Sequence, residues 1–237
     1  MSRKTIISES SPNLNHDEPC CLASIECIIL IAMGLEDAYE KALQDMAHLN
    51  PRTAAAKSGV SFDNNRFTIP LLNRTFTITH PDLNVAEAGS DTPPPKLVAV
   101  LLMHYLLHAD GTAVSGMWNT YRQLPGAHLF EQRFTNLVSR PMLQMFGNDA
   151  EGFNRAALAI GGKPMDRTGD AAFRLLALPK IPIGCILYLG DSEVSPSINI
   201  LFDEAAPHYL PTEDLTILGS LLNSALKSYK SIKTERK

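Results

Sequence analysis

The segment LVAVLLMHYLLHA, residues 97–109, decides the fold of this chain, because it is apolar on nearly every face over several helical turns. A helix of that composition has no polar side to turn towards water, so it belongs in the centre of a folded domain. Asp110 and Gly111 follow at once, and a glycine after an apolar run commonly ends a helix. The sequence therefore predicts a buried central helix over residues 97–109.

Three short apolar segments in the last third of the chain read as strands, because each is bounded by Pro or Gly and is too short for a typical helix. They lie at residues 173–178, 183–189 and 198–202. Their short connections favour an antiparallel meander, and the middle segment, which is apolar on both faces, is expected at its centre. A final helix is predicted from Thr212, a residue type that often caps helix N-termini, to about Tyr229.

Upstream of the central helix, alternation of apolar and polar residues predicts a β-hairpin of residues 66–71 and 75–79. Phe76 and Ile78 are expected to point inward, and Pro70 suits an edge position because it has no backbone N–H to donate. Helices are predicted elsewhere from three- and four-residue apolar spacing, from Pro51 after the cap residue Asn50, and from glycine boundaries. They lie at residues 35–50, 51–58, 128–146 and 150–160.

Composition excludes several classes of protein. Apolar residues make up 45% of the chain and charged residues 19%, which predicts a globular protein with a large core. The net charge of −4 gives no general attraction to nucleic acid or to an anionic membrane. Apolar runs reach only about a dozen residues, whereas a transmembrane helix needs about 20. We expect a soluble α+β protein in which an antiparallel sheet, made of the hairpin and the three-strand meander, packs with several helices.

The N-terminal segment differs in character from the rest. Residues 1–19 are polar and lack periodicity, and Asp17-Glu18 precedes the first apolar run, which does not fit a secretory signal peptide. A cytoplasmic location and reduced cysteines are therefore expected. We predict a disordered or wrongly assigned extension over residues 1–33, one α+β domain over 34–230 and a basic tail over 231–237. The alternative is a genuine extension in which residues 28–33 pack as a helix.

Four stretches carry a resemblance to a known family: LLMHYLL at 101–107, SGMW at 115–118 with YRQLPG at 121–126, LFD at 201–203, and YLPTEDL at 209–215. In this order and spacing they resemble the domain-of-unknown-function family 3786 of anaerobic bacteria and archaea, over roughly residues 36–226. The resemblance implies no established activity. Some relatives are fused to an iron–sulfur domain like that of corrinoid iron–sulfur proteins, which implies a setting in corrinoid or one-carbon metabolism.

Two features of the N-terminal part bear on this resemblance. Family-like sequence begins just after Met33, which is why we consider Met33 as a start site. Cys20, Cys21 and Cys27 lack the four-cysteine spacing that an iron–sulfur cluster needs, so no cluster is expected here.

His104 and His108 lie one turn apart on the predicted central helix, as paired metal ligands do. The zinc motif that uses this spacing has Glu directly after the first His, but Tyr105 stands there. A neutral core histidine is the ordinary interpretation. If one of the two binds a tetrapyrrole or corrinoid, His104 is the better candidate, because it falls within the family-like stretch.

Trp118, Tyr121 and Arg122 lie close together in a predicted loop, and a Trp beside an Arg can form a ligand platform. We predict that these three residues and His104 bind a cofactor. The alternative is structural: Trp118 covers the core, and Arg122 bonds to loop carbonyls or to Asp203. No catalytic residues and no metal site are predicted.

An acidic cluster surrounds the last strand and helix, formed by Asp203, Glu204, His208, Glu213 and Asp214. It has the chemistry of a divalent-cation site. The acids at 213 and 214 are also explained by the helix dipole, which favours negative charge in a first turn.

Three functions remain open from the sequence. The first is a non-catalytic binding or accessory protein that serves a cofactor or metalloenzyme, with a small molecule or a metalloprotein as partner. The second is an enzyme on a small anionic metabolite, with Arg122 as anion clamp and His104 or Asp203 as acid or base. The third is a protein-interaction module, which would show a large apolar patch. Neither nucleic acid nor membrane is expected as a partner.

Overall fold

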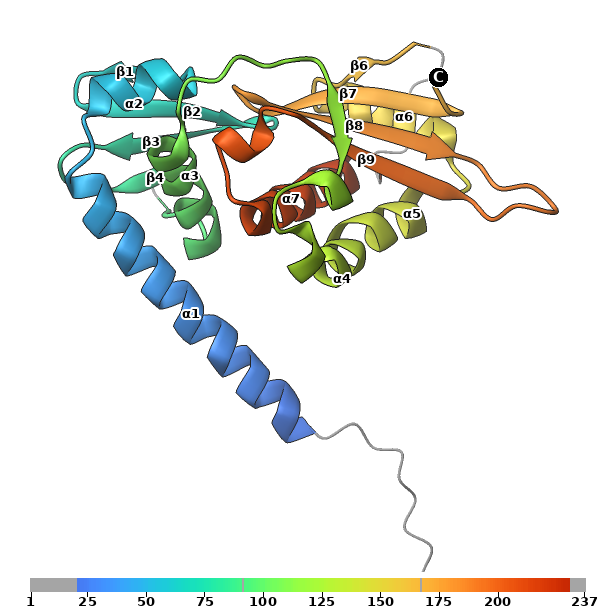
Figure 1. Ribbon diagram of the computed structural model, residues 1–237, viewed down its shortest axis with the longest axis horizontal. Coiled ribbons are helices and arrows are strands. Elements are labelled where there is room, and N and C mark those ends of the chain that lie inside the picture. Colours follow the sequence, from blue (N-terminus) through green and yellow to red (C-terminus); the bar gives the residue numbers. More distant parts are fainter. Residues whose placement is uncertain (1–20, 91, 167, 231–237) are drawn as a thin grey trace, which may run out of the picture.

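The computed structural model describes residues 21–90, 92–166 and 168–230, with the side chains of the first helix described from Gly34 on. It has the predicted α+β fold, with antiparallel sheets of four and five strands (Figure 1). The helices are α1 (Cys21–Ala47), α2 (Pro51–Ser58), α3 (Lys96–His108), α4 (Glu131–Phe134), α5 (Arg140–Phe146), α6 (Ala150–Ala159) and α7 (Thr212–Lys230). The strands are β1 (Ser61–Asp63), β2 (Arg66–Leu71), β3 (Arg74–Thr79), β4 (Val85–Glu87), β5 (Trp118–Thr120), β6 (Lys163–Pro164), β7 (Ala171–Leu178), β8 (Ile181–Tyr188) and β9 (Ser197–Asp203). Short 3₁₀ turns are η1 (Tyr121–Gln123), η2 (Ala127–Leu129) and η4 (Ala206–His208), and η3 (Thr135–Ser139) is π-helical.

The first described helix extends further towards the N-terminus than the sequence predicts. The predictions for residues 1–20 and for the basic tail 231–237 lie outside the described residues. Helix α1 begins at Cys21 rather than near Leu35 and runs without a break through Met33. The start at Met33 and the domain boundaries stay predictions. Along the described part of the chain, none of the helices combines the length and the apolarity that crossing a bilayer requires.

The four-stranded sheet contains the predicted hairpin as β2 and β3, with β1 and β4 on its flanks. Phe76 and Ile78 point inward and are fully buried, as predicted. Strand β2 has neighbours on both sides, but β1 pairs only as far as Thr68, so Pro70 lies where β2 has one partner. The flanking strands are only three residues long, too short for an alternating pattern to reveal them.

The five-stranded sheet contains the predicted meander in the order β5-β9-β8-β7-β6, with β8 at its centre as expected. The hairpin and the meander therefore lie in separate sheets, which are linked where the Leu72 N–H donates to the Ala177 carbonyl at 2.8 Å. The segment 113–125, which reads as a loop in the sequence, contributes the edge strand β5 beside β9. One continuous hydrophobic cluster includes side chains from both sheets and from α3 and α7.

The predicted central helix is α3, which contacts α1, α2 and α7. Its Tyr105 is fully buried; the phenol donates to the Ser58 carbonyl at 2.6 Å and accepts from the Lys180 N–H at 3.1 Å. It thereby joins α2 to the turn between β7 and β8. The prediction of a central apolar helix is confirmed. The hydroxyl of its buried Tyr105 is hydrogen-bonded to backbone groups of two other segments.

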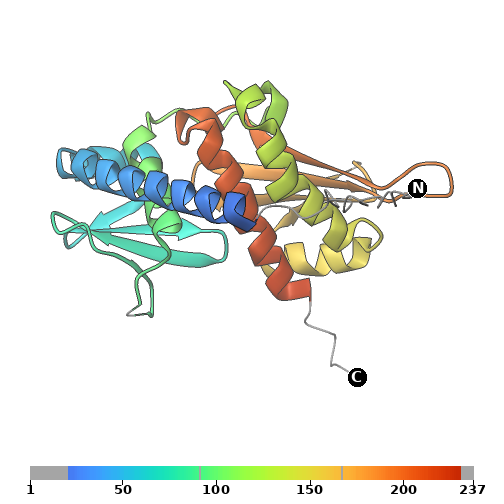
Figure 2. The same ribbon diagram turned by 90° about the horizontal axis from the view of Figure 1, so that it is seen from below.

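Helix α7 passes between two groups of elements (Figure 2). On one side lie α3 and the four-stranded sheet, and on the other lie α4, α5 and α6. The helix begins at Thr212 as predicted, but the Thr212 hydroxyl donates to the Pro125 carbonyl at 2.6 Å rather than capping the helix. The start of α7 is thus tied to the loop that follows η1.

Candidate functional site

His104 lies where α3 meets the first turn of α7. Its Nδ1 is 2.6 Å from Asp214 Oδ2, and the two side chains are 23% and 15% exposed. The His108 ring follows at 5.8 Å, and both burial and the charge of His104 lower the pKa of His108. Among the described residues, no group of three or more His, Cys, Asp or Glu side chains could hold a metal ion. The pair of His104 and Asp214 joins two helices.

Trp118 lies on β5, away from α3. A Cβ built on Gly184 would lie 3.5 Å from the Trp118 ring and 3.6 Å from the Met165 sulfur. Because Gly184 has no side chain, the indole can pack closely against β8 at this position. Trp118 thus covers one face of the five-stranded sheet, which is the structural alternative considered from the sequence.

Tyr121 is part of the core. Its ring stacks on Phe134 with centroids 3.9 Å apart, and its hydroxyl lies 2.7 Å from Thr216 Oγ1 and donates to the Thr212 carbonyl at 3.1 Å. Burial raises the pKa of this phenol above its ordinary value. These contacts fix η1 to α7.

Arg122, the next residue, points to solvent. Its side chain is 78% exposed and pairs with Glu131 rather than with Asp203. With Tyr121, Glu131 and neighbouring residues it lines a hollow of about 250 Å³. Neither His104 nor Trp118 lines that hollow. The structure therefore brings Tyr121 and Arg122 together and places the other two predicted cofactor-binding residues elsewhere.

Asp203 is fully buried, and backbone and side-chain donors surround its carboxylate. It accepts from the Ser115 N–H at 3.0 Å, the Ser115 hydroxyl at 3.2 Å, the Gly116 N–H at 2.7 Å and the Ala205 N–H at 3.0 Å. These four hydrogen bonds satisfy the carboxylate, which holds the loop around Ser115 in place and therefore has a structural role.

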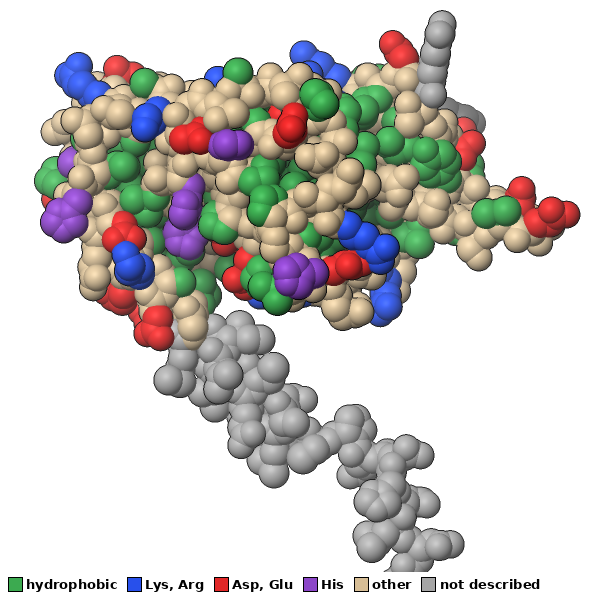
Figure 3. Space-filling view, in the orientation of Figure 1, with side chains coloured by type: hydrophobic (Ala, Val, Ile, Leu, Met, Phe, Trp, Pro, Cys, Tyr) green, Lys and Arg blue, Asp and Glu red, His purple; other side chains and the backbone are tan. Residues whose placement is uncertain are grey.

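Three other members of the acidic cluster, His208, Glu213 and Asp214, have separate partners. His208 pairs with Asp110 at 2.7 Å, and Glu213 pairs with Arg133 at 2.5 Å. Hydrogen bonds from Thr112, together with His208, lower the pKa of Asp110 to about 2. Figure 3 shows histidine side chains spread over this face rather than gathered in one hollow. The predicted acidic cluster is divided among several loops and helix ends.

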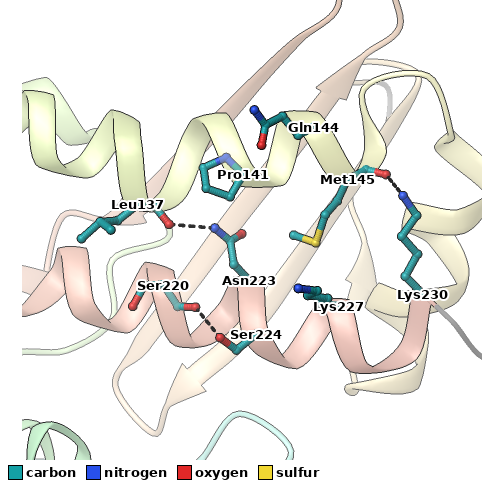
Figure 4. A pocket seen from close by; sticks show the side chains of 9 residues that line it. All are labelled: Leu137, Pro141, Gln144, Met145, Ser220, Asn223, Ser224, Lys227 and Lys230. Atoms are coloured by element: carbon teal, nitrogen blue, oxygen red, sulfur yellow. Dashed lines mark hydrogen bonds between the residues drawn. The ribbon is translucent and has the colours of Figure 1, made fainter. Parts of the chain in front are cut away.

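A groove of about 560 Å³ lies between α5 and the C-terminal half of α7, and we call it the α5–α7 groove (Figure 4). Its lining comes from η3, α5 and α7. The residues are Leu137, Pro141, Gln144, Met145, Ser220, Asn223, Ser224, Lys227 and Lys230.

The groove owes its shape to a break in the helix that runs from α4 to α5. Pro141 has no backbone N–H, so the Leu137 carbonyl four residues earlier loses its ordinary helical partner. Asn223 on α7 replaces that partner, because its Nδ2 donates to the Leu137 carbonyl at 3.1 Å and to the Val138 carbonyl at 2.9 Å. The intervening π-helical turn η3 is the local adjustment that such an interruption produces.

Close helix packing holds this arrangement. A Cβ built on Gly219 would lie 2.8 Å from Val138 Cγ1, so only glycine lets α7 approach η3 this closely. The approach brings Asn223 to within hydrogen-bonding distance of the freed carbonyls. The groove lies between these two helices, with residues of η3 and α5 on one side and residues of α7 on the other (Figure 4).

Asn223 leaves one polar atom without a partner. The residue is 6% exposed, and its Oδ1 is buried without a hydrogen bond to any residue that the structure describes. Ser220 and Ser224 donate their hydroxyls to backbone carbonyls of α7, as Figure 4 shows for Ser224, and the Lys230 ammonium donates to the Met145 carbonyl. The amide oxygen is therefore an acceptor that the groove leaves unused.

Sequence reasoning missed this groove, although two signals point to it. Pro141 lies inside a predicted helix, where a proline frees a carbonyl. Ser220, Asn223, Ser224 and Lys227 follow one another at helical spacing along one face of an amphipathic helix. Such a polar stripe facing another helix indicates a partner or a ligand.

Comparison with known proteins gives one match. A family model described as "Domain of unknown function (DUF3786)" matches residues 50–224. The match includes all four of the stretches on which the resemblance rests. No curated protein and no solved structure matches the chain.

Proposed function

The chain belongs to the DUF3786 family, and we propose that it is a non-catalytic binding or accessory protein whose ligand is a small molecule held in the α5–α7 groove. The observation that carries this proposal is the buried Asn223 Oδ1, which has no hydrogen-bond partner among the described residues and belongs to a side chain that lines a hollow of about 560 Å³. Buried acceptors in proteins nearly always have a donor, so a bound molecule is its natural partner.

The size and lining of the groove support a small-molecule ligand. Small-molecule sites commonly have volumes of roughly 300–1,000 Å³ and combine apolar walls with a few well-placed polar groups. Here Leu137, Pro141 and Met145 supply the apolar wall from one side. Ser220, Asn223 and Ser224 supply polar groups from α7.

The chemistry of the lining supports binding rather than catalysis. The groove lining has no histidine, cysteine or carboxylate, and the hydroxyls of its two serines, Ser220 and Ser224, already donate to backbone carbonyls of α7, so no activated nucleophile is present among the lining residues. Cys185 lies apart from it, fully buried, and burial raises its thiol pKa to about 12, which keeps it protonated.

An accessory role fits the metabolic setting that the family resemblance implies. A protein that serves a cofactor-dependent enzyme or a metalloenzyme needs to hold a small molecule without altering it. His104, our candidate tetrapyrrole or corrinoid ligand, is not part of the groove lining. We therefore propose the groove as the site of this small molecule, and cofactor binding by the four residues predicted from the sequence stays a separate prediction.

Methyl NMR on the full chain tests this function. With ¹³C-methyl-labelled methionines, titration with 2-anilinonaphthalene-6-sulfonate should shift the Met145 signal, because Met145 lines the groove. Met117, which is 64% exposed, reports adventitious binding elsewhere. Saturable shifts at Met145 but not at Met117 would support the proposal. A Met145 signal that stays constant with this probe and with its uncharged analogue would overturn it.

A further inference from the structure

The α5–α7 groove has a one-sided charge. Two of its lining side chains are lysines, and none is an aspartate or glutamate. A hollow lined by charge of one sign concentrates ligands of the opposite sign. We infer that the ligand is an oxyanion, namely a carboxylate or a phosphate ester. It also has an apolar body and an N–H or O–H group, and this inference rests on the proposed function of the groove.

The two lysines have different surroundings. The Lys230 ammonium donates to the Met145 carbonyl and lies 5.3 Å from the centre of the Phe146 ring, so its position at the end of the groove is fixed. Lys227 lies nearly one turn earlier on the same helix and forms no salt bridge with any described residue. Lys227 is therefore the lining cation whose charge is not already engaged by a described residue, and it is the side chain that we expect to pair with the anion.

The two walls of the groove define the body of the ligand. Leu137, Pro141 and Met145 follow one another at four-residue spacing and form an apolar wall on one helix. Ser220 and Ser224 supply polar lining from the other helix, α7 (Figure 4). A ligand that lies along the groove thus has one apolar edge and one polar edge, with its anion at the Lys227 end.

Asn223 sets the third requirement. Both Nδ2 hydrogen bonds go to backbone carbonyls, and this fixes which way the amide is turned and leaves Oδ1 as an acceptor only. The oxygen is hidden from bulk water in the free protein. A ligand that satisfies this acceptor must therefore carry an N–H or O–H donor and must displace the side chains that cover Oδ1.

Three probes with one carbon skeleton test these requirements. The first is 2-anilinonaphthalene-6-sulfonate, which carries an anion and an N–H. The second is N-phenyl-2-naphthylamine, which lacks the anion, and the third is 2-phenoxynaphthalene-6-sulfonate, which lacks the N–H. The sulfonate should bind about tenfold or more tightly than either analogue, because hydrogen bonds to charged or buried groups are each worth that much. Its affinity should also fall as salt is added.

Variants assign the charge effect to one side chain. Lys227→Met should remove most of the preference for the anionic probe, and Lys227→Arg should retain it. Lys57→Met is the matched control, because Lys57 is also an exposed lysine in the last turn of its helix. Met145 methyl shifts report whether each probe occupies the groove.

Each outcome separates the inference from the proposed function. If all three probes shift Met145 with equal affinity and Lys227→Met changes nothing, the groove binds ligands but the oxyanion inference is wrong. If the ether binds as tightly as the amine, the requirement for a donor is wrong. If no probe shifts Met145, the proposed function fails, and the inference fails with it.

Discussion

The two halves of α7 differ in how far their polar groups are satisfied. In the N-terminal half, Asp214 pairs with His104, Glu213 pairs with Arg133, and Thr216 bonds to Tyr121. In the C-terminal half, Asn223 has an unused buried acceptor, and Lys227 has no salt bridge with a described residue. The first half carries the residue types that catalysis favours, yet their contacts hold elements of the fold together.

The difference shows that residue type and binding capacity are separate properties. His, Trp and Arg attract functional interpretation because their chemistry is versatile, but each of their polar groups can be used up by a neighbour. Asn and Ser are seldom chosen as functional residues from a sequence. A buried amide oxygen without a hydrogen bond nevertheless has a free-energy cost, and a ligand that donates to it can relieve that cost. Four substitutions test whether the N-terminal half of α7 stabilises the fold while the C-terminal half binds a ligand.

Filling the groove should have the largest effect. Ser224→Phe places a ring where the ligand would lie, so binding of 2-anilinonaphthalene-6-sulfonate at Met145 should be lost. Ser228→Phe is the matched control, because both serines are exposed and bond to the carbonyl four residues earlier, but only Ser224 lines the groove. Equal binding by the two variants would place the probe outside the groove.

Closing the helix contact should destabilise the fold. Gly219→Ala forces Cβ against Val138, and we expect the free energy of unfolding to fall by about 1–3 kcal/mol. Without that contact, alanine in a helix would instead stabilise by about 1 kcal/mol. Denaturant unfolding in a Val138→Ala background provides the control, because the obstructing methyls are absent there. If Gly219→Ala costs as much in that background, the close approach of the two helices is not the cause.

Removing the Tyr121 hydroxyl tests the N-terminal half. Tyr121→Phe leaves Thr216 and the Thr212 carbonyl without their buried partner, so the free energy of unfolding should fall by about 1–2 kcal/mol. Probe binding at Met145 should not change. In a Thr216→Val background the cost should be smaller. A Tyr121→Phe variant of normal stability and weakened ligand binding would return Tyr121 to the list of binding residues.

The smallest effect concerns pH. The folded protein holds the pKa of His108 below its ordinary value of 6.5, so the unfolded chain binds more protons just below pH 6.5. Stability should therefore fall as the pH drops from 6.5 towards the folded pKa, and it should be constant above 6.5 as far as this group is concerned. His108→Gln should flatten that part of the profile, as measured by thermal unfolding at several pH values. The charges around the ring are His104, Asp214 and Asp45. If the His108→Gln variant loses stability with falling pH as steeply as the unmodified protein, another titrating group causes the pH dependence.

Most of the fold could be predicted because it depends on periodicity. The apolar run at residues 97–109 had to be buried, and the meander around residues 183–189 followed from short apolar segments between turn residues. The strands β1, β4, β5 and β6 have two or three residues each, and such strands exist only because a longer neighbour offers them hydrogen bonds. No local pattern could have identified them.

The candidate site was predictable only in its parts. Pro141 and the polar stripe on α7 are visible in the sequence, and a proline inside a helix predicts a freed carbonyl. Whether that carbonyl finds Asn223, water or nothing depends on how two helices cross. The residues predicted for binding, His104, Trp118, Tyr121 and Arg122, stay a prediction as a group, although the structure places them in three different surroundings.

The sequence alone determined the α+β class, the family and the identity of the buried helix and strands, because hydrophobic periodicity and turn residues act locally along the chain. Tertiary structure decided which polar groups are satisfied. Gly219 lets α7 approach η3, and Asn223 then turns its amide nitrogen to two carbonyls and leaves its oxygen in the groove wall. Asn223 lies 86 and 85 residues from the two residues whose carbonyls it binds, so only the packed protein reveals which of its polar atoms are satisfied.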